Sequence, residues 1–189
     1  MLKVLDQVGL KKDDVAFVQF GTAGQPERAM AVLRKQASAT ILTAPNTYAA
    51  EKQGLRKFSV IRDLGIRQLI TVTATTKRFL REKRDAVEAF LRGYVEALWH
   101  VKSQRDVTIR VIAKYTRQHD PDVLSKFYED LVPDLPRMPY VDETSLHATV
   151  EAMQIQGPPL PKVDVKALFD NSLLKGLEND GFVDRFKPR

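Results

Sequence analysis

Residues 15–33 read VAFVQFGTAGQPERAMAVL, and this stretch decides the predicted fold. Its first six residues form a short apolar run rich in strand formers, which is typical of a buried strand. A glycine-containing turn follows at 21–25, and Pro26 suits the first position of a helix. A strand that leads at once into a helix is the first half of a βαβ unit.

The same alternation continues along the chain. Further strands are predicted at residues 39–44, 58–61 and 69–74. A short helix over residues 48–53, closed by Gly54, separates the first two of these strands. Strands and helices that alternate with short connections predict a parallel sheet, so the expected fold class is α/β.

Beyond residue 75 the apolar residues take helical spacing instead. The clearest case is 86–99, where they cover one broad face of a helix. Asp106, Asp120 and Asp142 are predicted to cap further helices, and a last short helix is predicted over 173–177. The second half of the chain is therefore expected to be helical.

Composition excludes several function classes. The chain has 189 residues, a net charge of +6 and no cysteine, so disulfides, thiolate metal sites and cysteine nucleophiles are absent. Its basic residues alternate with acidic ones, which is typical of solvated helix faces rather than of a nucleic-acid interface. The apolar runs are too short to span a membrane, and residues 1–6 do not resemble a signal peptide.

No pattern of residues indicates catalysis. His100, His119 and His147 lie far apart and outside any metal-binding spacing. The serines lack the setting of a hydrolase nucleophile, and no glycine-rich nucleotide loop is present. We therefore predict no catalytic residue, no metal ligand and no cofactor.

Two loops are candidate ligand sites, because each follows a predicted parallel strand and precedes a helix. Ligands bind at that edge of open α/β sheets, and the free N–H groups of a helix N-terminus favour an anion there. An ordinary turn, with Thr22 and Asn46 only capping helices, is the alternative interpretation. The candidate substrate-binding residues are Gly21, Thr22, Ala23, Gly24, Pro45, Asn46 and Thr47.

Several segments, in order, resemble one known family. Residues 24–28 (GQPER) resemble a "GSPER" segment of that family, and 42–54 (LTAPNTYAAEKQG) match it as well. Together they resemble the nitrate, sulfonate and taurine-type solute-binding proteins of ABC importers, a family that includes pyrimidine-precursor synthases of thiamine biosynthesis. Lys35 and Ser38 depart from it, since a glycine and an aspartate commonly stand there. The remaining matching segments are 63–65, 76–80, 86–94, 113–116, 120–121, 170–172 and 180–182.

The resemblance implies a two-lobed, type II periplasmic-binding-protein-like fold that is truncated at its N-terminus. Residues 1–64 would be part of the second lobe, and 65–189 the C-terminal part of the first lobe. Asp63, Leu64 and Gly65 would form part of the hinge. The export signal and the rest of the first lobe would lie ahead of Met1, and a chain without half its sheet should expose apolar surface and form a homo-dimer.

The implied function is solute binding for an ABC importer in the periplasm, without catalysis. The ligand would be a small anionic or polar organic solute, and the membrane permease would be the protein partner. One alternative is an iron-dependent pyrimidine-precursor synthase, but that branch uses a cysteine-rich motif. The other is a cytoplasmic effector-binding module of the LysR type, whose helix-turn-helix segment has no counterpart here.

Overall fold

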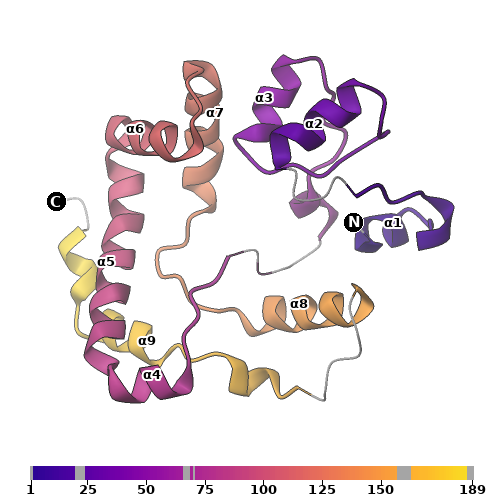
Figure 1. Ribbon diagram of the computed structural model, residues 1–189. Coiled ribbons are helices and arrows are strands. Elements are labelled where there is room, and N and C mark those ends of the chain that lie inside the picture. The colour runs from indigo at the N-terminus through magenta and orange to yellow at the C-terminus, as the bar shows by residue number, and fades with distance from the viewer. Residues whose placement is uncertain (1, 20–23, 66–68, 70, 157–162, 187–189) are drawn as a thin grey trace. The chain divides into compact units, whose positions relative to one another are not determined.

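The elements of regular secondary structure that the structure describes are all helical. The computed structural model describes residues 2–19, 24–65, 69, 71–156 and 163–186 (Figure 1). Helices and 3-10 turns form the regular secondary structure of the described residues, which contain no strand. The predicted α/β fold with a parallel βαβ lobe is therefore wrong.

The strand predictions failed because strand preference and strand pairing are separate requirements. Apolar and β-branched residues favour an extended backbone, and Val15 does take one (φ −136°, ψ 144°). A strand also needs a neighbouring backbone to bond its N–H and C=O groups. Among the described residues, segments 16–19, 39–43, 55–60 and 71–76 have no such ladder, and Phe17 and Phe58 are 49% and 73% exposed.

The chain divides into two compact units. Unit 1 consists of Met1–Ile66 and Thr108–Pro133, and unit 2 of Arg67–Val107 and Asp134–Arg189. The sequence predicted one division, at residue 64. In the structure, the chain also changes unit after Val107 and after Pro133.

Unit 1 is built around α3, which packs against α2 and α7. Its buried side chains include three alanines and the larger Val123, Leu124 and Tyr128. The predicted helices near residues 26, 48, 107 and 121 are confirmed. The helices of this unit are α1 (Leu2–Gln7), α2 (Gln25–Leu33), α3 (Asn46–Lys52), most of α6 (Arg105–Thr116) and α7 (Pro121–Leu131), with 3-10 turns at Lys12–Asp14 and Ile61–Leu64.

Helices α2 and α3 end in the same backbone motif with different residues. After α2, Lys35 donates its N–H to Val32, and the next N–H reaches Ala31. After α3, Gly54 donates to Glu51 in the equivalent way. Both residues have a left-handed backbone conformation, with φ of 59° for Lys35 and 95° for Gly54, as this helix ending requires. The position where the resembled family commonly has glycine thus has a backbone that favours glycine, although lysine occupies it.

Unit 2 encloses a core of larger apolar side chains. Helix α5 packs against α4, α9 and the 3-10 turn that follows α9. Val95, Leu177 and Val183 are at most 1% exposed in this core. The helices are α4 (Lys77–Glu82), α5 (Arg84–Ser103), α8 (Glu143–Gln156) and α9 (Ser172–Asn179), with 3-10 turns at Val165–Leu168 and Phe182–Phe186; the turn Val132–Asp134 spans a unit boundary.

Candidate functional site

The two candidate loops meet within unit 1, at the N-termini of α2 and α3. The side-chain amide of Gln25, the first residue of α2, bridges to Thr43, which precedes α3. Gln25 Nε2 donates to Thr43 Oγ1 over 2.7 Å, and Gln25 Oε1 accepts from the Thr43 N–H over 2.6 Å. The structure therefore brings the described ends of the two loops together, while Gly21, Thr22 and Ala23 lie outside the described residues.

Gly24 has extended backbone at the start of α2 (φ −72°, ψ −175°). A Cβ atom at this position would lie 2.9 Å from Glu27 Oε2, so a larger residue here would displace the end of that flexible side chain. Glu27 lies in the first turn of α2, where a negative charge complements the helix dipole. The N-terminus of α2 thus has an acidic side chain of its own.

The second loop offers fewer accessible groups than the sequence predicted. Pro45 is buried, and its peptide bond with Ala44 is cis. Helix α3 begins at Asn46, two residues before the predicted start, and no side-chain bond caps it. Asn46 and Thr47 are partly exposed and remain able to meet a ligand.

The predicted hinge residues lie just before the chain leaves unit 1. Asp63 and Leu64 end a 3-10 turn, and Gly65 takes a left-handed φ of 67°. Gln7 Nε2 donates to the Leu64 carbonyl over 2.6 Å, which ties this turn to α1. Gly65 directly precedes Ile66, where the first segment of unit 1 ends. The role of residues 63–65 as a hinge stays a prediction.

Arg28 is a candidate residue that the sequence analysis missed. Its Nε atom is buried and has no hydrogen-bond partner among the described residues. A helical side chain covers the turn before its own Cα, so Arg28 belongs over the first turn of α2. A buried donor without a partner costs roughly 1–3 kcal/mol, which an anionic ligand would offset. The sequence does contain a signal for this site, because Arg28 comes three residues after the helix start at Gln25 and shortly after a glycine-containing turn.

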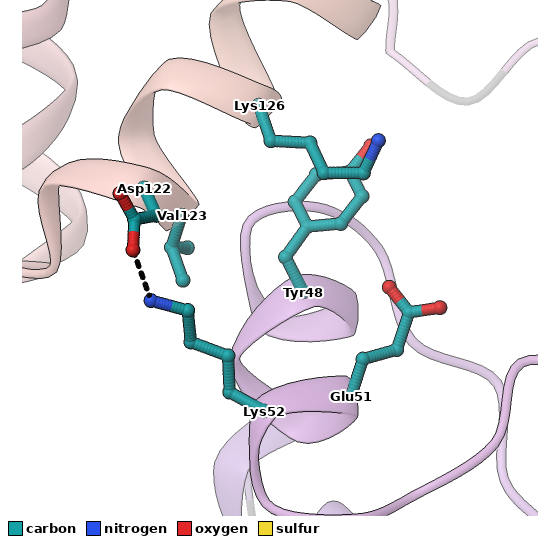
Figure 2. A pocket seen from close by; sticks show the side chains of 6 residues that line it. All are labelled: Tyr48, Glu51, Lys52, Asp122, Val123 and Lys126. Carbon is teal, nitrogen blue, oxygen red and sulfur yellow. Dashed lines mark hydrogen bonds and ion pairs between the residues drawn. The ribbon is translucent and has the colours of Figure 1, made fainter.

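A second group of polar side chains surrounds a pocket of about 290 Å³ between α3 and α7 (Figure 2). Val123, at 1% exposure, lies at its edge among longer polar side chains. Lys126 extends across the ring of Tyr48, with its Nζ atom 5.3 Å from the ring centroid. The lining residues are Tyr48, Glu51, Lys52, Asp122, Val123 and Lys126.

Three of the charges near this pocket form what we call the Lys52 cluster, made of Lys52, Asp120 and Asp122. Lys52 Nζ lies 2.6 Å from Asp120 and 2.9 Å from Asp122. The hydrogen bond to Asp120 is the main cause that raises the pKa of Lys52. In turn, the bond from Lys52 and the backbone N–H of Val123 lower the pKa of Asp120. Asp120 also caps α7, as the sequence predicted.

Tyr48 joins the same two helices through its hydroxyl group. It donates to Asp130, and this bond is the main cause that lowers the pKa of the Asp130 carboxyl. Lys57 lies 5.6 Å from the Tyr48 ring centroid and 3.6 Å from Glu51. Each charge around the pocket thus has an opposite charge beside it, so these groups are already paired without a charged ligand. The pairs that bridge α3 and α7 are exposed, and exposed ion pairs add little to stability.

His100 and His147 lie on exposed helix surfaces with polar neighbours, and His119 is exposed in the loop between α6 and α7. His100 contacts Gln104 and Glu96, and His147 lies 3.8 Å from Glu143. Among the residues that the structure describes, no group of three acidic or histidine side chains could hold a metal ion.

Comparison with known proteins identified no relative: no family model, no curated protein and no solved structure matches the chain. Within the described part of the chain, no helix is both long and apolar enough to cross a membrane.

Proposed function

We propose that this chain binds a small anionic or polar organic solute as part of the solute-binding component of an ABC importer. The observation that carries the proposal is the meeting of the two loops, through the paired hydrogen bonds between Gln25 and Thr43. The matching segments from Gly24 to Phe182 support the choice of this class over other binding proteins. The same resemblance supports a periplasmic location and a membrane permease as partner.

The chemistry of the loops favours a ligand that carries acceptor oxygens. The Thr43 N–H already bonds a carbonyl oxygen, that of the Gln25 amide. Nitrate, a sulfonate or a pyrimidine carbonyl presents the same kind of acceptor, and would enter by replacing the Gln25 side chain. Arg28 supplies a positive charge whose Nε donor has no partner within the described part of the chain. Asn46 and Thr47 add hydrogen-bonding groups from the start of α3.

Binding in this scheme involves no bond-making chemistry. Hydrogen bonds and charge hold the solute. The proposed role is therefore that of a carrier and not of an enzyme.

Isothermal titration calorimetry with nitrate, taurine, a longer alkylsulfonate and a pyrimidine tests the proposal. Arg28→Met should weaken binding of the anions about tenfold or more, because a charge-assisted bond is lost. Gln25→Ala should strengthen binding, because the competing amide is gone. Arg34→Met is the matched control, since Arg34 is exposed at the other end of α2.

Two results would contradict the proposal. One is a chain that is folded by circular dichroism and binds none of the four solutes. The other is an equal loss of affinity in Arg28→Met and Arg34→Met, which would show that only the general charge matters.

A further inference from the structure

Helix α5 is the longest helix of the chain and has apolar residues on two sides. One side packs in the core of unit 2 through Val95, which is fully buried, and Leu98, which is 9% exposed. The sequence predicted one broad apolar face over residues 86–99. In the structure, only part of that face is covered.

The uncovered part is a continuous line of residues, which we call the outer stripe. Its members recur at intervals of one to four residues, so they share one side of the helix. Phe90 is 54% exposed and Tyr94 38%, and their rings stack with centroids 6.2 Å apart. The outer stripe consists of Ala86, Phe90, Gly93, Tyr94 and Ala97, all exposed.

Large and small residues alternate along the outer stripe in a way that fits a copy of itself. A Cβ atom built on Gly93 would meet no atom within 4 Å, so the middle of the stripe is open. Consider a second α5 that runs antiparallel, with a two-fold axis beside Gly93 and Tyr94. Phe90 of one copy then faces Ala97 of the other, and Tyr94 faces Gly93. This is the self-complementarity that a two-fold interface requires.

The chain also exposes more surface than compact bodies of its mass. It exposes 13,783 Å². Two separate compact bodies of half this mass would expose about 5,500 Å² each, so the chain exceeds their sum by about 2,800 Å². Extended segments such as 55–60 and 71–76 contribute to this excess, and the outer stripe is a part of it that a second copy can cover.

We propose that a second copy of this chain docks on the outer stripe, so that two α5 helices cross antiparallel at Gly93. The dimer is held by apolar contact between aromatic rings and the small residues opposite them. It is independent of the solute site, because the outer stripe belongs to unit 2 and the proposed solute site to unit 1.

Sedimentation equilibrium over a range of concentrations gives the first test. The chain should dimerise, and Phe90→Glu should raise the dimer dissociation constant about tenfold or more, because a charge is placed in an apolar contact. Phe58→Glu is the matched control, since Phe58 is more exposed than Phe90 but lies in unit 1. A monomer at all concentrations, or an equal effect of both substitutions, would overturn the proposal.

Disulfide trapping gives a second test, which the absence of cysteine makes unambiguous. Gly93→Cys places one thiol beside the proposed two-fold axis, and oxidation should link most of the protein into dimers. Gly176→Cys, at a helical glycine of α9 with equally open surroundings, should stay monomeric. Equal or absent cross-linking of the two variants would count against the antiparallel crossing.

Discussion

The forces that stabilise unit 1 internally differ from those that stabilise unit 2. In unit 2, large apolar side chains such as Leu177 and Phe182 enclose one another around α5. In unit 1, hydrogen bonds and ion pairs on the α3–α7 contact surround a smaller group of buried side chains, several of them alanines. The comparison shows that unit 2 has a hydrophobic core of large side chains. Unit 1 depends more on polar contacts, whose strength changes with pH.

The largest expected effect comes from opening the core of unit 2. Leu177→Ala should lower the free energy of unfolding by about 2–5 kcal/mol, since Leu177 is 1% exposed and its loss leaves a cavity. Urea unfolding followed by Trp99 fluorescence measures this, because the only tryptophan of the chain packs on Phe186 in unit 2. Leu168→Ala, at a side chain 54% exposed, is the control and should change little. Equal destabilisation by both would contradict the assignment of the core.

The two helix ends of unit 1 give the next effect. Lys35→Gly should stabilise the chain by about 1 kcal/mol, because glycine adopts the left-handed backbone of that position without strain. Gly54→Lys is the reciprocal change and should destabilise it by about 1–2 kcal/mol. Thermal unfolding by far-ultraviolet circular dichroism measures both. A loss of stability in Lys35→Gly would show that the lysine side chain has a compensating contact.

A single hydroxyl group tests the polar character of unit 1. Tyr48→Phe removes the donor to Asp130 and should cost about 1 kcal/mol. The loss should show in the circular dichroism transition but leave the Trp99 transition in place, because Tyr48 and Trp99 lie in different units. If both transitions shift together, the two units unfold as one, which would contradict the separate stabilisation of unit 1 and unit 2.

Acid should weaken unit 1 through the Lys52 cluster. The folded pKa of Asp120 lies below its ordinary value of 3.8, so its contribution to stability is present above that value and is lost as pH falls through the folded pKa. Asp120→Asn should remove this dependence on pH, which stability measurements between pH 5 and pH 2 would reveal. Asp170, in unit 2, also has a lowered pKa, chiefly through its bond from Ser172, so Asp170→Asn is the matched comparison.

In unit 2, Tyr140 is expected to make stability depend on pH in the alkaline range. Burial, followed by the hydrogen bond to Glu178, raises the pKa of Tyr140 to about 12. Its contribution to stability is therefore complete below pH 10 and is lost as pH rises from there to about 12. Ultraviolet titration of tyrosinate should show one late-ionising group that Tyr140→Phe removes. If that variant titrates like the unsubstituted chain, Tyr140 is not the late group.

The sequence predicted the helices well because their signals are local. Asp120 caps α7 as expected, and Gly54 takes the left-handed backbone that ends a helix. The strands were mispredicted because pairing depends on residues far away in the chain, which propensity at 15–20 or 39–44 does not reveal. The internal bridge from Gln25 to Thr43 was missed for the same reason: its partners are 18 residues apart.

That bridge lowers the apparent affinity of the proposed site. Gln25 is attached to the protein, so the amide that a solute must displace is present at a fixed local concentration and never diffuses away. The apparent dissociation constant is therefore the intrinsic constant multiplied by one fixed factor at every solute concentration. A single substitution at position 25 would change that factor without touching the solute itself.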